Sequence, residues 1–380
     1  MSGSYGLAVA REIHSVEEFD RHVERFGHLV DAVVQGVDLS DRSEVLEQVT
    51  VTGAVFLGAV LTEPSLRRVI DAGGCVFPGL PDLPFEPYRP HLYRQGELLT
   101  GWSPDRPGSF DLALDSRIYA WSRQQPRGAH LPVVDALARR LHDLAIDDAL
   151  RDHLDHHAEV VAVMGGHGLA RTDPAFRTVA ELGRMMARAG WLVATGGGPG
   201  AMEAANLGAW LAPHPDAALD RSLTLLADEP DFRAVDGYLA AGAAVLEDLP
   251  DGGGSLAVPT WFYGHEPTNQ FATHVAKYFA NSIREDGLLA IATRGVVFAP
   301  GSAGTIQEVF QDATQNHYAV FGVISPMVFL DRPFWRDTLP AEPLLRSLAA
   351  GRPYVDLVGV ADDAAEAMSF LVEHPPVGAG

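Results

Sequence analysis

Apolar runs that stop at glycine turns constrain the fold of this 380-residue chain more than any other feature. Residues 160–164 (VVAVM) form a continuous apolar run, as expected of a parallel strand covered on both faces, and end at the turn Gly165-Gly166-His167-Gly168. Residues 296–299 (VVFA) stop likewise at Pro300-Gly301, and a helical pattern follows. Repeated strand–helix units predict an α/β fold with a doubly wound, Rossmann-like parallel sheet that binds ligands at the carboxyl ends of its strands.

Further elements follow from the same patterns. Strands are expected at residues 191–194, 223–226, 255–258, 323–330 and 355–360. Helices are expected at residues 174–189, 234–246, 268–282, 305–315 and 361–373. We expect a Rossmann-like domain over residues 131–380 and an N-terminal α+β extension over residues 1–130, whose role no motif indicates.

Composition argues against several classes of function. The formal net charge of −22 disfavours a nucleic-acid polymer or an anionic membrane as partner, because both need a basic surface. The apolar runs are far shorter than the roughly 20 residues of a membrane span, and the first residues lack the pattern of a signal peptide. Cys75 is the only cysteine, which excludes internal disulfide bonds and a cysteine-based zinc site. We therefore expect a cytoplasmic protein.

The segment 300–308 (PGSAGTIQE) joins a glycine turn to the start of a helix. The first backbone N–H groups of a helix are unpaired and carry the positive end of its dipole, so they bind phosphate readily. Thr305 adds a hydroxyl donor at this position. Glu308 lies one helical turn further on, where its carboxylate would face whatever the phosphate is attached to.

The segment 196–206 (GGGPGAMEAAN) is a second glycine-rich motif. Gly196, Gly198 and Ala201 formally satisfy the dinucleotide fingerprint. That fingerprint, however, follows the first strand of its unit and needs an acidic residue at the end of the next strand. Asp216 has about the right separation but precedes the next expected strand, so a mononucleotide is favoured over a dinucleotide.

Together these two motifs resemble the PGGxGTxxE and GGGxxGxMxAAN signatures of the LOG family. Members of that family are cytokinin-activating nucleoside 5′-monophosphate phosphoribohydrolases, often misannotated as lysine decarboxylases. The resemblance covers roughly residues 158–330; Ser302 replaces the second glycine of the first signature, and the second is one residue shorter after its triple glycine. It implies hydrolysis of AMP-like or cytokinin nucleotides to free base and ribose 5-phosphate, without a cofactor, by a homodimer.

The resemblance also implies roles for individual residues. Glu308 would stabilise the oxocarbenium-like ribose and orient water, and Arg284 would act with it as the second catalytic residue. Arg294 is the alternative arginine, but it precedes a strand and so belongs to the edge opposite the ligand. No metal site is expected. The residues expected to bind phosphate and nucleotide are Gly165, Gly166, Gly196, Gly197, Gly198, Gly200, Met202, Glu203, Asn206, Gly301, Ser302, Gly304 and Thr305.

A polar and aromatic segment, residues 261–269 (WFYGHEPTN), follows the expected strand at 255–258. It is interpreted either as a wall of the binding site, with an aromatic face for a base, or as a purely structural loop. In the first case Thr268 would be the N-cap of the next helix.

Three other functions stay open on the sequence. A protein of the same fold could bind or sense a nucleotide without cleaving it. An NAD-linked oxidoreductase would bind a dinucleotide and release no base. A pyridoxal-phosphate-dependent decarboxylase would need a Schiff-base lysine, for which Lys277, the only lysine, is the sole candidate.

Overall fold

The computed structural model describes residues 11–124, 131–157 and 159–378, which form two compact units. Of the described residues, the first unit comprises 11–91 and 131–149, and the second comprises 92–124, 150–157 and 159–378. The expected domain boundary at residue 130 lies outside the described residues. In the described ranges no helix is long and apolar enough to cross a membrane.

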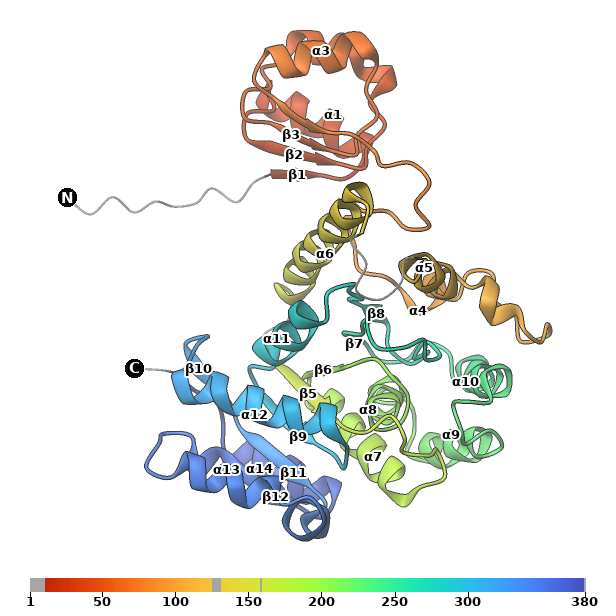
Figure 1. The fold of residues 1–380 in the computed structure, drawn as a ribbon, viewed down its shortest axis with the longest axis vertical. Helices are drawn as coiled ribbons and strands as arrows, with labels where there is room; N and C mark the ends of the chain where they lie inside the picture. Colours follow the sequence, from red (N-terminus) through yellow and green to blue (C-terminus); the bar gives the residue numbers. More distant parts are fainter. Residues whose placement is uncertain (1–10, 125–130, 158, 379–380) are drawn as a thin grey trace. The chain divides into compact units, whose positions relative to one another are not determined.

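The first unit is built on a four-stranded parallel sheet whose strands lie in chain order (Figure 1). A helical segment between successive strands returns the chain to the same end, so that Val33 pairs with Val55 and Val55 with Cys75. Phe19 and Phe56 are fully buried in its apolar core. The elements are β1 (Arg11–Ile13), α1 (Val16–Phe26), β2 (Ala32–Gln35), α2 (Ser43–Gln48), β3 (Val55–Leu57), α3 (Glu63–Asp71) and β4 (Cys75–Phe77).

The second unit contains a seven-stranded sheet in the order β12-β11-β9-β5-β6-β7-β8, in which every neighbouring pair is parallel. From β5 the chain proceeds through β6 and β7 to β8 on one side, and from β9 through β11 to β12 on the other. The strand order therefore reverses between β5 and β9, and ligands of such sheets bind outside the carboxyl ends at this point. The strands are β5 (Val160–Met164), β6 (Leu192–Thr195), β7 (Ser255–Ala257), β8 (His274–Val275), β9 (Gly295–Phe298), β11 (Met327–Leu330) and β12 (Val358–Ala361).

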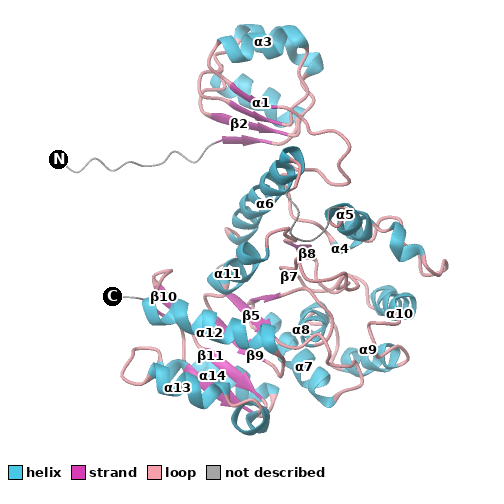
Figure 2. Cartoon of the chain, in the orientation of Figure 1, coloured by secondary structure: helices cyan, strands magenta, loops and turns pink. Residues whose placement is uncertain are grey.

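Helices flank this sheet on both faces (Figure 2). The long helix α6 (Val133–Leu154) contributes residues to both units. Two short strands, β10 (Val323–Ile324) and β13 (Val377–Gly378), form a separate antiparallel pair. The other helices are α4 (Gln95–Leu98), α5 (Leu114–Ser122), α7 (Pro174–Arg188), α8 (Ala201–Trp210), α9 (Ala217–Ala227), α10 (Val235–Asp248), α11 (Asn281–Ile291), α12 (Ala303–Tyr318), α13 (Ala341–Ala349) and α14 (Ala364–Glu373).

Helices α7, α8 and α14 share one apolar core with the sheet. Phe176 of α7 and Leu371 of α14 are fully buried there beside Val163 of β5. Local sequence fixes the ends of α7, because the Asp173 side chain accepts a hydrogen bond from a first-turn N–H, and Gly190 then leaves the helix in the left-handed region (φ 88°). Helices α11 and α12 pack side by side, with α11 against β5.

The predicted α/β fold with a doubly wound parallel sheet is confirmed, although several expected elements differ. Residues 223–226, expected as a strand, lie within α9, because Leu219, Ser222 and Leu226 are buried with helical spacing. Residues 268–280 were expected to be helical but contain the short edge strand β8, so α11 begins only at Asn281. The expected strand at 323–330 is interrupted by Pro326, and residues 355–357 form a 3-10 turn before β12.

Candidate functional site

A cavity of about 570 Å³ lies along the carboxyl ends of β9, β5, β6, β7 and β8. It therefore includes the point between β5 and β9 where the strand order reverses. The turns after these two strands are tied together, since the Gly166 N–H donates to the Pro300 carbonyl (2.9 Å). The Gly166 carbonyl in turn accepts from the N–H of Ala201, the first residue of α8 (3.2 Å). These hydrogen bonds hold the carboxyl ends of β5, β6 and β9 together around the cavity.

The N-terminus of the 16-residue helix α12 opens into this cavity. Ser302 is its N-cap, and the Ser302 side chain makes no capping hydrogen bond, so the N–H groups of the first turn lack that partner. Ser302, Gly304 and Thr305, three of the residues expected to bind phosphate, line the cavity. Gly301 lies behind them, where an added Cβ would collide with the Thr305 hydroxyl.

Glu308 and Arg284 meet in the cavity lining. The Arg284 Nη1 lies 3.4 Å from the Glu308 Oε1, and its Nε donates to the Val258 carbonyl (2.9 Å). Both side chains are largely buried, with 11% and 13% of their surface exposed. Burial raises the pKa of Glu308, and the positive charge of Arg284 opposes that rise. The pair is therefore a carboxylate in a partly desolvated place with one cation beside it.

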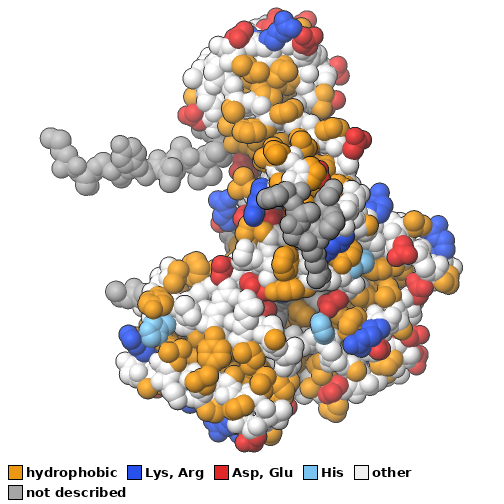
Figure 3. All heavy atoms as spheres, viewed as in Figure 1, with side chains coloured by type: hydrophobic (Ala, Val, Ile, Leu, Met, Phe, Trp, Pro, Cys, Tyr) orange, Lys and Arg blue, Asp and Glu red, His pale blue; other side chains and the backbone are white. Residues whose placement is uncertain are grey.

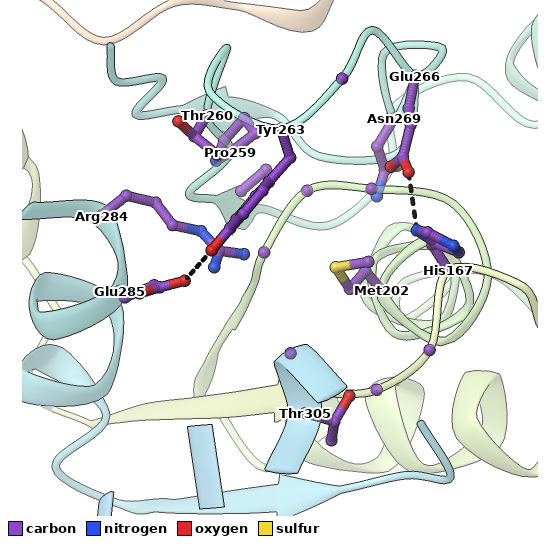
Figure 4. A pocket seen from close by; sticks show the side chains of 18 of the residues that line it. His167, Met202, Pro259, Thr260, Tyr263, Glu266, Asn269, Arg284, Glu285 and Thr305 are labelled. Atoms are coloured by element: carbon purple, nitrogen blue, oxygen red, sulfur yellow. Dashed lines mark hydrogen bonds and ion pairs between the residues drawn. The ribbon is translucent and has the colours of Figure 1, made fainter. Parts of the chain in front are cut away.

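The second glycine turn, residues 196–198, also lines the cavity. An added Cβ at Gly196 would collide with the Arg284 guanidinium, so this glycine allows the arginine to pass close to the backbone. Gly197 has a φ of 74°, which an L side chain rarely adopts, and a Cβ at Gly198 would come within 2.9 Å of Glu266. Met202 of α8 points into the cavity beside this turn (Figure 4).

Four of the residues expected to bind the nucleotide do not line the cavity: Gly200, Glu203, Asn206 and Gly301. Glu203 is buried and accepts hydrogen bonds from the Arg171 Nη2 (2.6 Å) and from the Tyr238 hydroxyl. Asn206 bonds to the side chains of Thr195 (2.7 Å) and Asn269 (2.9 Å). On α8, one face thus meets the cavity through Met202, whereas Glu203 and Asn206 hold the loops behind it.

The loop between β7 and β8 supplies cavity residues that the motifs do not identify. Its Tyr263 donates to Glu285 of α11 (3.0 Å), and its Glu266 pairs with His167 of the turn after β5 (2.8 Å). Figure 4 shows both contacts, on opposite sides of the cavity. The aromatic segment therefore contributes to the wall, but Thr268 is no helix N-cap, because no helix follows it.

Asp115 of α5 anchors this loop from behind. It is fully buried and accepts from the Trp261 Nε1 (2.7 Å), the Thr268 hydroxyl (2.8 Å) and the Lys277 ammonium (2.9 Å). Burial alone would raise the pKa of Asp115, but the charges of Lys277 and His265 and the hydrogen bonds lower it below the usual value. The only feature of the sequence that points to this hydrogen-bonded group is that Lys277 is the single lysine of the chain.

Among the residues the structure describes, no group of three or more His, Cys, Asp or Glu could hold a metal ion. Asp216, the acidic residue considered for a dinucleotide, precedes α9 and pairs with Arg188 (2.9 Å) outside the cavity lining. The carboxylates of Glu266, Glu285 and Glu308 all line the cavity. The arrangement suits a ligand smaller than a dinucleotide, with an anionic group at α12 and hydrogen-bond donors that face these carboxylates.

Comparison with known proteins finds a family similarity over part of this unit and solved structures of low sequence identity. The model of the SLOG cluster4 family matches residues 158–212, which include the turns at 165–168 and 196–200 but not Arg284 or Glu308. The curated proteins include no match to the sequence. Similar solved structures include the molybdenum cofactor binding protein from the phototrophic bacterium Rippkaea orientalis (15% identity, TM-score 0.37) and the molybdenum cofactor carrier protein from Chlamydomonas reinhardtii (22%, 0.34). These similarities cover 57% of this chain and 98% and 99% of the two structures.

Proposed function

We propose that this protein hydrolyses the N-glycosidic bond of nucleoside 5′-monophosphates and releases a free base and ribose 5-phosphate. One observation carries the proposal: the N-terminus of α12 and the Glu308–Arg284 pair line the same cavity. An anion site and a carboxylate one helical turn apart match the two ends of a ribose 5-phosphate.

The 5′-phosphate would bind at the start of α12. The helix dipole and the first-turn N–H groups favour an anion there, and the Thr305 hydroxyl adds a donor. Such a site needs no basic surface, so it is compatible with a net charge of −22. The free energy of phosphate binding would then help to position C1′, the reacting carbon, although C1′ itself is remote from the phosphate site.

Glu308 would act on the ribose. Cleavage breaks the bond between C1′ and the base nitrogen, whose electron pair leaves with the base, and positive charge develops on the sugar. The Glu308 carboxylate would stabilise that charge and accept a proton from the water that attacks C1′. The departing base takes up one proton from solvent and leaves in its neutral form, and Glu308 returns the proton of the attacking water to solvent, so that the protons balance.

Arg284 would position Glu308 and keep it ionised. Its guanidinium is fixed by the Val258 carbonyl and by the space that Gly196 leaves open. A carboxylate in this partly desolvated place would otherwise favour its neutral form, which cannot stabilise a cation. Arg284 is therefore assigned as a positioning residue, whose removal changes the charge state of Glu308.

The test is direct. The purified protein is incubated with a panel of nucleoside 5′-monophosphates and with the matching nucleosides, and the products are separated by chromatography. The proposal expects free base from the monophosphates and little from the nucleosides, because the nucleosides lack the phosphate. Binding of monophosphates without any base release would favour the alternative, a nucleotide-sensing protein of the same fold.

A homodimer stays a prediction, and one surface of the second unit is suited to it. Large apolar side chains are exposed near the end of α12 and on α13, and Figure 3 shows hydrophobic side chains gathered on this part of the surface. They include Tyr318 (72% exposed), Phe321 (51%) and Leu344 (59%). Sedimentation of the wild type and of a Phe321→Glu variant would reveal whether this surface joins two copies.

A further inference from the structure

The only lysine of the chain, Lys277, lines the cavity. It follows the edge strand β8 and is 7% exposed. Its ammonium lies 2.8 and 2.9 Å from the two carboxylate oxygens of Asp115. An ammonium has three N–H donors, so contacts to two oxygens leave one donor for the cavity.

The environment of Asp115 fixes the ammonium in place. The Trp261 Nε1 also donates to one Asp115 oxygen and the Thr268 hydroxyl to the other. Each carboxylate oxygen therefore has a second partner besides the ammonium. The Lys277 ammonium also lies 5.3 Å from the centre of the Trp261 ring. A buried ion pair is a weak source of stability, because both ions lose their hydration. An ammonium held this rigidly at a cavity wall is suited instead to recognising a ligand atom, because it can donate a hydrogen bond from a fixed position.

Lys277 and the start of α12 lie at opposite ends of the cavity. Strand β8 is four strands away from β9, which precedes α12, and this separates the two strand ends by about 19 Å at the usual strand spacing. Phosphate at α12 and ribose at Glu308 would place the base between these ends, directed toward β8. Leu98 and Val275, from the same edge of the unit, line the cavity there and provide apolar surface for the flat faces of a base.

Building on the proposed function, we infer that Lys277 determines specificity for bases that carry a carbonyl oxygen at the edge away from the sugar. Its free N–H donates to that oxygen, as in hypoxanthine, guanine or an oxopyrimidine. Adenine presents an amino group at the same position, so two donors would face each other and both would stay unpaired in a desolvated site. The same ammonium also stabilises the negative charge that develops on the carbonyl of the departing base.

Inosine and adenosine 5′-monophosphates test the inference, because they differ at this edge alone. For the wild-type protein we expect a kcat/KM for base release, and an affinity in calorimetry, that favour the inosine nucleotide about tenfold or more. Equal values for the two nucleotides, or a preference for adenosine, overturn the inference. If neither nucleotide loses its base, the hydrolase proposal fails, and the binding preference alone decides the role of Lys277; if neither binds, both proposals fail.

Two variants separate recognition from folding. Lys277→Met leaves the buried Asp115 without its cation and can prevent folding, so the double variant Asp115→Asn/Lys277→Met removes both charges together. We expect the inosine-to-adenosine ratio of the double variant to fall toward one, in kcat/KM and in affinity. A folded double variant, as judged by circular dichroism, that keeps the wild-type ratio overturns the inference; if it does not fold, the wild-type comparison decides.

Discussion

Glu308 Oε1 lies 3.4 Å from Arg284 Nη1, although the two residues are 24 positions apart on different helices. The contact exists because α11 and α12 pack side by side and direct these side chains to the same cavity. Both side chains are largely buried, so the ion pair lies in an environment less polar than bulk water. Arg284 is the neighbour that lowers the pKa of Glu308, whereas burial and the charge of Glu285 raise it, so the pair is an informative target for mutation.

Glu308→Gln should reduce base release by several orders of magnitude and leave nucleotide affinity within a fewfold of wild type. Glutamine keeps the shape of the side chain but carries no charge to stabilise an oxocarbenium-like ribose. Chromatography of the released base gives the rate, and calorimetry with a nucleoside 5′-monophosphate gives the affinity. Turnover at the wild-type rate would exclude Glu308 as the catalytic carboxylate.

The activity should fall on the acid side at a higher pH than an ordinary glutamate would cause. Burial raises the pKa of Glu308 above its usual value, and only the ionised form stabilises the sugar cation, so kcat is lost as the pH falls through that raised pKa. In Arg284→Gln the opposing positive charge is gone, and the acid limb should move further up in pH. Profiles of kcat against pH for the wild type, for Arg284→Gln and for the control Arg332→Gln, whose partly exposed side chain lies outside the cavity lining, measure the shift. An unmoved limb in Arg284→Gln would disprove the coupling.

Gly196→Ala should impair catalysis through Arg284. The added methyl group would occupy the space of the guanidinium, and a displacement of about 1 Å at such a site can reduce kcat/KM roughly a hundredfold. Gly168→Ala is the matched control, because its Cβ would meet no atom within 4 Å. Steady-state kinetics of both variants decide the matter. If the two variants behave alike, Gly196 has no special relation to Arg284.

The strands that the sequence predicts best are those whose pattern is complete within a few residues. Strand β5 coincides with the expected range because all five residues are apolar and buried, and a glycine turn stops the run. The prediction of a strand at 223–226 was wrong because a run of only four residues, three leucines and a threonine, fits either a strand or one side of a helix. Burial of Leu219, Ser222 and Leu226 over a longer window shows the helical period of α9.

Some residues of the site could likewise be predicted from a short stretch of sequence, whereas others come together only in the fold. The turn after β9 could be predicted because its chemistry, an open helix start with Glu308 one turn on, is contained in nine consecutive residues. Asp115 and Lys277 are 162 positions apart, and His167 and Glu266 lie in different loops, so only the folded sheet edge brings each pair together. Glu203 lies within a predicted motif, yet the direction of its side chain depends on Arg171, which no local pattern indicates.

Loss of Arg171 should destabilise the protein. Arg171 and Glu203 are both almost fully buried, with 2% and 3% of their side chains exposed, so Arg171→Met leaves a buried carboxylate without its cation. We expect a loss of about 3–5 kcal/mol in the free energy of unfolding, measured in urea. The double variant Arg171→Met/Glu203→Met should recover much of that loss. A stable Arg171→Met variant that no longer binds nucleotide would instead place this pair in the ligand site.

Asp312 should make the stability of the protein depend on pH. It lies one turn beyond Glu308 on α12, is 2% exposed, and its Oδ2 has no hydrogen-bond partner. Burial raises its pKa from 3.8 to about 8. The unfolded chain therefore ionises this group near pH 4 and the folded chain only near pH 8, so the free energy of unfolding falls as the pH rises between these values. Asp312→Asn should reduce that slope and be several kcal/mol more stable relative to wild type at pH 8 than at pH 4, at about 1.4 kcal/mol per pKa unit. Urea unfolding at a series of pH values, with the exposed Asp228→Asn as control, measures the slope; an unchanged slope in Asp312→Asn would show that Asp312 is ionised in the folded protein.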